Sequence, residues 1–498
     1  MEKDVYVYKM KEAKYPHFPY NPSEHYPEFQ QFIFSQDLSG SNEVYNAVRQ
    51  LFYKLGFDAE NYGKDSWNPL KNHVLPGQSV LIKPNLVFHE HPFGEDEVLS
   101  MISNASVLRP VIDYVLLATG GDVNLVIGDA PVQGGDFQEA VRISGIDQLV
   151  KFYESNHVKI QLIDMRMLIS KRNKMGVLAE KKMNPSRSPE MYVCVDLKQK
   201  SELYPVIKKA KRFEITDYGK KAVLRHHNQL KNEYLIPKEV LEVDLFINIP
   251  KLKTHRKAGL TCAMKNLVGI NGDKTCLAHH TRGLKNHGGD EFSEKDFKTI
   301  FRTRLWAFLK RHTWGIKIAG LIKCFFQRVV WNGQSLNEYK MLQKPKVFAE
   351  GSWYGNDTIW RCVKDLNKII LYADRNGKMQ DIKQRKYLCI VDAILAGEKE
   401  GPMEQSTKEF GVIFGGVNPV YIDYTAAKLM RYDYRDVPVI ANSFKNQWWN
   451  LVEKKAEDVV IDSNNPIDNI ASYFIPSFGW QDKLYNTQST ERLMENDS

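Results

Sequence analysis

The sequence predicts an α/β protein with a mostly parallel sheet, helices on both faces of that sheet, and two insertions. Between residues 79 and 165, apolar runs typical of buried strands alternate with segments of helical periodicity. Similar apolar runs return at 243–250, 387–392 and 410–415. Strands that are apolar along their whole length, rather than at every second residue, are typical of a parallel sheet buried on both faces.

The first half of this core, residues 79–165, contains strand, helix, strand, helix and strand in turn. The first strand runs into Pro84 and the second has a polar end. The expected elements are strands at 79–83, 123–131 and 158–164 and helices at 107–118 and 137–144. An extended and helical N-terminal region, residues 1–78, precedes them.

The rest of the chain divides into segments that differ in composition and in hydrophobic periodicity. Residues 166–236 are basic and alternate in places, which predicts a β-rich insertion. The core returns over 237–295, with a site loop rich in lysine and histidine, and again over 346–480. Residues 296–345 predict an amphipathic, cationic helical insertion, and the polar tail 481–498 predicts disorder.

Composition restricts the class of protein. The 498 residues carry a net charge of +9, and outside the cationic segment 298–331 the chain is close to neutral, so a specific nucleic-acid partner is not expected. The six cysteines are scattered without a C-x-x-C pair, which fits a reducing compartment and argues against a disulfide framework, an iron–sulfur cluster or a structural zinc site. The N-terminus does not resemble a signal peptide, and no apolar run reaches ~18 residues. We therefore expect a cytoplasmic protein, with the oligomeric state left open.

Charged and amide side chains follow the predicted strands, where ligands bind in an open α/β sheet. The densest stretch follows the strand at 243–250 and combines lysines, histidines and an amide, which suit phosphate or carboxylate. Its ordinary alternative is a solvated basic loop, but the position at a strand end favours an anion site. The stretch contains Lys251, Lys253, His255, Lys265, Asn266, Gly269, His279, His280 and Arg282.

Carboxylates lie at other strand ends. Asp129 and Asp392 are expected to hold a divalent ion such as Mg²⁺ or to move protons. Asp423 is expected to contact the substrate, and its alternative is to cap the helix running to Met430. No spacing of ligands is specific enough to name an ion.

Together these residues form the expected site. The predicted catalytic residues are His255, Lys253, Lys265, Asp129 and Asp392, with His255 as general acid or base. The predicted substrate-binding residues are Lys83, Asn85, Lys251, Asn266, Gly269, His279, His280, Arg282, Gly401 and Asp423.

The segment 298–331 holds eight cations and no acid. It is amphipathic in two pieces, and its basic and tryptophan residues are typical of helices on an anionic membrane surface. The alternative is a helical hairpin packed on the protein with a solvated basic side. A membrane contact would place the protein at the inner face of the membrane.

Seven segments, in this order along residues 80–430, resemble the domain-of-unknown-function family 362. They are I-K-P-N at 82–85, G-D-A-P at 128–131, P-K-L-K-T-H at 250–255, M-K-N-L-V-G at 264–269, V-D-A-I at 391–394, E-G-P at 400–402 and N-P-V-Y-I-D at 418–423. The family usually has Asp where this chain has Asn418. Some relatives carry ferredoxin-like cysteine clusters that this sequence lacks. The resemblance therefore implies the fold and the position of the site, and not a cluster.

Three functions follow. The first is an enzyme, a transferase or hydrolase of a phosphorylated or carboxylated small molecule. The second is a redox or maturation protein that works beside an iron–sulfur partner. The third is a non-catalytic protein bound to the membrane surface through 298–331. No P-loop, G-x-S-x-G or H-E-x-x-H pattern decides between reaction classes.

Overall fold

A mostly parallel sheet forms the centre of the molecule in this computed structural model, which describes residues 3–30, 38, 40–172, 178–215, 220–309, 318, 344–445 and 448–484. Its parallel strands lie in the order β14-β10-β2-β3-β4, and the antiparallel β15 continues the sheet beyond β14. β1 pairs with β15 and with β16 at the far edge. The bounds are β1 Val5–Lys9, β2 Ser79–Pro84, β3 Asn124–Asp129, β4 Ile160–Asp164, β10 Leu245–Ile249, β14 Lys386–Glu400, β15 Glu404–Gly416 and β16 Ile461–Ser463.

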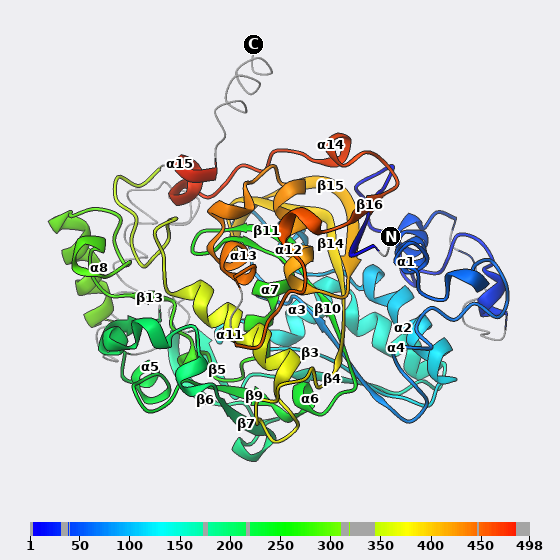
Figure 1. Ribbon diagram of the computed structural model, residues 1–498, viewed down its shortest axis with the longest axis horizontal. Coiled ribbons are helices and arrows are strands. Elements are labelled where there is room, and N and C mark those ends of the chain that lie inside the picture. Colours follow the sequence, from blue (N-terminus) through cyan, green and yellow to red (C-terminus); the bar gives the residue numbers. More distant parts are fainter. Residues whose placement is uncertain are drawn as a thin grey trace, which may run out of the picture.

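Helices cover both faces of the sheet, which confirms the predicted fold class. Successive residues of one strand enter different cores: Leu125 and Ile127 pack in one, Val126 in the other. On the first face lie α1 (Glu43–Lys54), α2 (Ala105–Thr119), α3 (Phe137–Ser144) and α4 (Ile146–Ser155). On the second lie α7 (Ala263–Asn266), α11 (Ile359–Tyr372), α12 (Pro419–Leu429) and α13 (Pro438–Ser443), as Figure 1 shows.

Local sequence explains where the connecting helices begin and end. The Asn104 side chain accepts a hydrogen bond from the Ser106 amide at 2.9 Å and begins α2. Gly120, with φ of +60°, ends it in the left-handed conformation that favours glycine. These caps return the chain to the sheet at β3.

The segment 166–236 forms the β-rich insertion that the sequence predicts. Its strands pair antiparallel to one another or to β13, apart from the central sheet. The elements here and nearby are β5 Leu168–Arg172, β6 Leu178–Met183, β7 Tyr192–Asp196, β8 Phe213–Glu214, α5 Lys220–His226, β9 Glu233–Pro237, α6 Lys238–Leu241 and β13 His280–Thr281.

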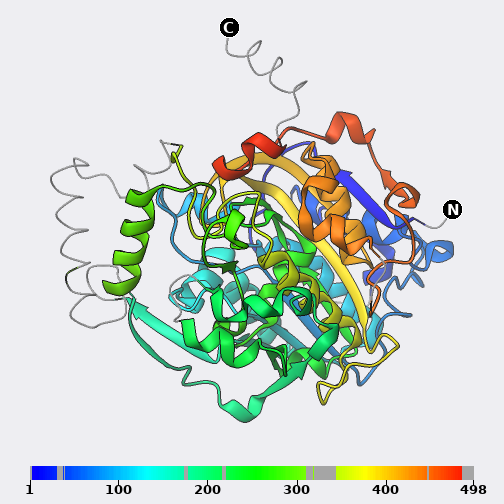
Figure 2. The ribbon, with the colours of Figure 1, turned by 60° about the vertical axis from the view of Figure 1, so that its left-hand side comes forward.

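The cationic insertion begins with α8 (Phe297–Leu309), at the periphery of the molecule in Figure 2. Its apolar residues Phe301 and Leu305 are exposed. The second amphipathic piece, apart from Ile318, lies outside the described residues. So does the tail after α15 (Gln481–Leu484), which follows α14 (Ile467–Ile470). Within the described ranges, no helix combines the length and apolarity needed to cross a membrane.

Candidate anion-binding site

The chain changes direction in the sheet between β2 and β10. From β2 it continues to β3 and β4 on one side, whereas from β10 it continues to β14 on the other. Ligands of open α/β sheets bind at the carboxyl ends of the strands beside such a switch point. Lys83 lies at this end of β2 in register with Asn248 of β10, and Lys251 follows β10 after Pro250. The predicted site residues thus begin at the usual position of a ligand.

Lys83 and Asp129 form a buried ion pair across the ends of β2 and β3. Lys83 Nζ lies 2.8 Å from Asp129 Oδ1, and the lysine is fully buried. The Leu86 amide donates to Asp129 Oδ2 at 2.7 Å and the Ala130 amide to Oδ1 at 2.9 Å. Burial lowers the pKa of Lys83, and the Asp129 carboxylate opposes that shift. Asp129 therefore accepts from two backbone amides and from Lys83, and it holds the lysine in place.

Gly269 packs directly against this pair. A Cβ there would collide with Asp129 Oδ1 and lie 2.6 Å from Lys83 Nζ. The Gly269 carbonyl also accepts a hydrogen bond from the Ala130 amide at 2.9 Å. A glycine is needed here because backbone and side chain approach so closely.

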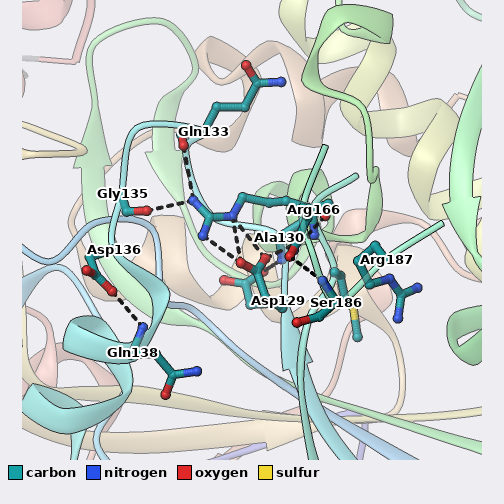
Figure 3. A network of polar contacts seen from close by, with 12 residues as sticks. Asp129, Ala130, Gln133, Gly135, Asp136, Gln138, Arg166, Ser186 and Arg187 are labelled. Atoms are coloured by element: carbon teal, nitrogen blue, oxygen red, sulfur yellow. Dashed lines mark hydrogen bonds and ion pairs between the residues drawn. The ribbon is translucent and has the colours of Figure 1, made fainter. Parts of the chain in front are cut away.

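Arg166 holds the loop that follows Asp129, as Figure 3 shows. Its guanidinium donates to the carbonyls of Val132 at 2.9 Å and Gly135 at 2.7 Å. The same group lies 2.6 Å from the Asp164 carboxylate. The loop beside the Lys83–Asp129 pair is therefore fixed by a charged side chain with little exposure.

Lys251 and Asp392 form a second ion pair, with both side chains fully buried. Lys251 Nζ lies 2.8 Å from Asp392 Oδ2. Tyr15, from the N-terminal region, donates to Asp392 Oδ1 at 2.9 Å, and the Asn104 amide donates to Oδ2 at 3.0 Å. Within the described residues, neither Asp129 nor Asp392 is gathered with two further His, Cys, Asp or Glu ligands. Each of these two carboxylates is therefore paired with a lysine, and their role in binding Mg²⁺ stays a prediction.

Lys253 and Lys265 form no ion pair with a carboxylate in the part of the chain that the structure describes. Lys253 is 1% exposed, and its Nζ donates to the Met101 carbonyl at 2.5 Å. Burial, and then the charges of Lys251 and Lys265, lower the pKa of Lys253 well below its usual range. Burial and the neighbouring Lys257 lower the pKa of Lys265 to about 8. Lysines therefore outnumber carboxylates at this point in the protein.

Two histidines join these lysines. Burial and the Lys265 charge lower the pKa of His255 well below its usual range, so the ring is neutral at pH 7. The Lys257 amide donates to His255 Nδ1 at 3.0 Å, which leaves the proton of the neutral ring on Nε2. Burial and Lys257 lower the pKa of His279 in the same way. A neutral His255 is suited to donate to an anion through Nε2, more than to act as a base.

Other predicted residues form hydrogen bonds within the elements around these lysines. The Asn266 amide donates to Asn248 Oδ1 at 2.7 Å. Asp423 accepts from the Met264 amide at 3.3 Å and so caps α7, while Asn418 caps α12. The alternative that Asp423 caps its own helix is therefore wrong. Burial raises the pKa of Asp423 to about 7.

Segment 251–255 forms a strand, β11 (Lys251–His255), where the sequence predicts a loop. It pairs with β12 (Gly259–Thr261) and with β14. A Cβ at Gly401 would collide with the Thr254 carbonyl of β11, so Gly401 permits close packing of the β14–β15 turn on this strand. Asn85 Oδ1 accepts from the Val87 amide at 3.2 Å in the turn after β2.

His280 and Arg282 lie beside a different group of charges. Glu214 lies 3.9 Å from the His280 ring and 3.7 Å from the Arg282 guanidinium. Arg304 contacts Glu291 at 2.6 Å in the same group. These two predicted residues therefore interact with acids outside the lysine group.

Sequence reasoning missed Tyr15 and Lys274. Tyr15 lies 236 positions from Lys251, so no local pattern connects them. Lys274 donates to the Val268 carbonyl at 2.9 Å, and burial lowers its pKa to about 7, with Lys83 and Lys265 among the charges near it. Its position just after Gly272 was the one available signal.

The match to a family model agrees with this geometry. The family described as Domain of unknown function (DUF362) matches residues 177–428. The chain belongs to this family. The DUF362 match runs from β6 into α12 and so contains Lys253, His255 and Lys265, while Lys83 and Asp129 precede it. No curated protein matches the chain.

Proposed function

We propose that this DUF362 protein is an enzyme acting on a small molecule that carries a phosphate or carboxylate, bound at the carboxyl ends of β2 and β10. The observation that carries the proposal is the lack of a carboxylate partner for Lys253 and Lys265 among the described residues. A lysine without a counter-ion in a protein interior costs several kcal/mol as an ammonium group, and its pKa falls for that reason, as it does for Lys253. Such a cost is retained where a ligand supplies the missing negative charge.

The surrounding groups have distinct parts in this proposal. Lys253 binds the anion, and the Nε2 proton of His255 stabilises negative charge that develops on the substrate. Lys265, with a pKa of about 8, exchanges a proton near neutral pH. The Lys83–Asp129 and Lys251–Asp392 pairs fix the geometry. We place this activity in the cytoplasm, because scattered cysteines are typical of a reducing compartment.

A thermal-shift screen tests the proposal. The panel contains inorganic phosphate, nucleotides, sugar phosphates and dicarboxylates, each with and without Mg²⁺. A ligand at about 100 times its Kd should stabilise the wild type by ~2.7 kcal/mol. The shift should disappear in Lys253→Ala and persist in Lys151→Ala, whose side chain is 75% exposed. Absence of any shift across the panel, or an equal shift in Lys253→Ala, would contradict the proposal.

A second candidate function is contact with an anionic membrane surface. It is favoured by the exposed aromatic residues of α8, where Phe297 is 74% and Phe301 69% exposed. The exposed cations Lys298 and Arg302 each directly follow one of these phenylalanines in sequence, as in helices that rest on anionic lipid. Co-sedimentation with phosphatidylglycerol vesicles should be lost in Phe301→Asp and retained in Leu230→Asp, an exposed residue elsewhere. Wild-type protein that stays in the supernatant would refute this candidate.

A further inference from the structure

A group of potential metal ligands lies where the turn before η9 (Lys274–Cys276) meets the end of α5. His226 ends α5, Asp273 precedes η9, and Cys276 ends it. One ligand atom from each residue lies within 4.8 Å of the other two. Cys276 is fully buried and Asp273 is 8% exposed, whereas the His226 side chain is 21% exposed. The group therefore has an inner side closed by protein and an outer side open to solvent.

Outer contacts orient the histidine toward the group. His226 Nδ1 lies 2.8 Å from Glu233 Oε1, at the start of β9. A carboxylate on one ring nitrogen fixes the proton there and leaves Nε2 to bind a metal, as is usual for histidine ligands. Lys231 Nζ also contacts Glu233 Oε1 at 2.6 Å, so the negative charge of this carboxylate is already balanced. The charge of a bound cation would then be matched by Asp273 and the Cys276 thiolate.

The types of ligand in this group indicate which metal ion would bind. A thiolate sulfur, an imidazole nitrogen and a carboxylate oxygen are the three ligand types that Zn²⁺ binds in proteins, with tetrahedral geometry. Mg²⁺ and Ca²⁺ prefer oxygen ligands and would not recruit a cysteine. Three protein ligands leave a fourth position for water.

We propose that His226, Asp273 and Cys276 bind one Zn²⁺ ion. The ion holds the turn at 271–276 against α5 and β9. That turn already contacts β9 through the Gly272 amide, which donates to the Leu235 carbonyl at 2.8 Å. Lys274 lies between two of the ligands and reaches toward the lysine group, so the ion helps to position it. The proposal does not depend on the proposed enzyme function.

The other group of three potential ligands among the described residues does not support a metal site. It consists of Glu214, His280 and Glu291. The Arg304 guanidinium lies 2.6 Å from Glu291 and 3.8 Å from Glu214. The charge of these carboxylates is therefore already balanced by a cation of the protein. No such guanidinium is paired with Asp273 in the described structure.

Cobalt substitution tests the site in the full-length protein. Protein stripped with a chelator under reducing conditions is titrated with Co²⁺ and then with Zn²⁺. One equivalent of Co²⁺ should give a thiolate-to-cobalt charge-transfer band and the intense visible bands of tetrahedral cobalt, and one equivalent of Zn²⁺ should remove both. Cys276→Ser should lose the charge-transfer band, while the matched control Cys389→Ser, a buried cysteine of β14, should keep it.

Two further variants keep the test decisive if Cys276→Ser folds poorly. His226→Ala changes a partly exposed side chain and should also abolish tetrahedral binding, with circular dichroism confirming the fold. Glu233→Gln should weaken Zn²⁺ binding by ~10–100-fold. The proposal is overturned if no charge-transfer band forms, or if the band survives in both Cys276→Ser and His226→Ala.

Discussion

Replacing Lys253 by methionine should stabilise the ligand-free protein. The Lys253 side chain is buried and forms no ion pair with a carboxylate among the described residues, and the charges of Lys251 and Lys265 disfavour its protonated form. Methionine fills nearly the same volume without a charge. Exchanging buried ionic groups for apolar ones often stabilises a protein by ~1–4 kcal/mol. Loss of the hydrogen bond to the Met101 carbonyl costs about 1 kcal/mol. The expected net gain is about 0–3 kcal/mol.

Lys251→Met should have the opposite effect and destabilise the protein. Here the variant leaves the Asp392 carboxylate buried without its counter-ion, although Tyr15 and Asn104 still donate to it. Removing one partner of a buried pair costs ~3–5 kcal/mol. The two lysines are two positions apart in one strand, yet their methionine variants should change the free energy of unfolding in opposite directions.

Urea unfolding at pH 7 without added anions, followed by tryptophan fluorescence, measures both variants. Equal m-values would show that the midpoints report stability alone. Lys253→Met should unfold at higher urea than the wild type and should lose the anion-induced thermal shift. If Lys253→Met were instead destabilised as strongly as Lys251→Met, Lys253 would be a structural residue and the argument for an anion site would fail.

Three other predictions concern packing and pH. Gly269→Ala should cost at least ~1–3 kcal/mol in urea unfolding and weaken anion binding, because the new methyl group displaces Asp129; wild-type values for both would contradict the packing argument. An anion bound at Lys265 should raise its pKa from about 8, so binding takes up protons and weakens as pH rises above 8; calorimetry at pH 8.5 in two buffers of different ionisation enthalpy should give unequal heats, and equal heats would rule this out. Asp423, with a folded pKa of about 7 against 3.8, keeps its proton in the folded state between these values while the unfolded carboxyl ionises. Stability should therefore fall by up to ~4 kcal/mol from pH 4 to pH 7, and Asp423→Asn should flatten that profile in urea unfolding at pH 4, 5.5 and 7.

The sheet and its first helices could be predicted because their apolar patterns are local. The later strands could be predicted only in part. β14 runs from Lys386 to Glu400, well past the apolar run at 387–392, because pairing with β15 and β11 extends it through polar residues. Likewise, 251–255 reads as a basic loop, since its strand conformation comes from hydrogen bonds to distant partners and not from its own residues.

The position of the site could be predicted from the sequence, but the ion pairs of its lysines could not. Lysines at strand ends converge because parallel strands share an edge. The sequence places Lys251 and Lys253 in the same anion site, yet only Lys251 forms an ion pair with a carboxylate. The register between β11 and β14 shifts between these two residues, and that irregularity separates their environments. The proposed zinc ligands are a further case: the argument from sequence considered clustered cysteines, whereas the fold gathers one cysteine with a histidine and an aspartate.

The pairing of β1 with β15 and β16 has a consequence for synthesis of the chain. The hydrogen bond from the Val460 amide to Asp4 spans 456 positions. Ribosomes add ~5–20 residues per second, so β1 waits tens of seconds for its partner strands. During that time Val5 and Val7, fully buried in the finished protein, have no sheet to join. The nascent chain therefore presents a short apolar strand until nearly all of it has been made.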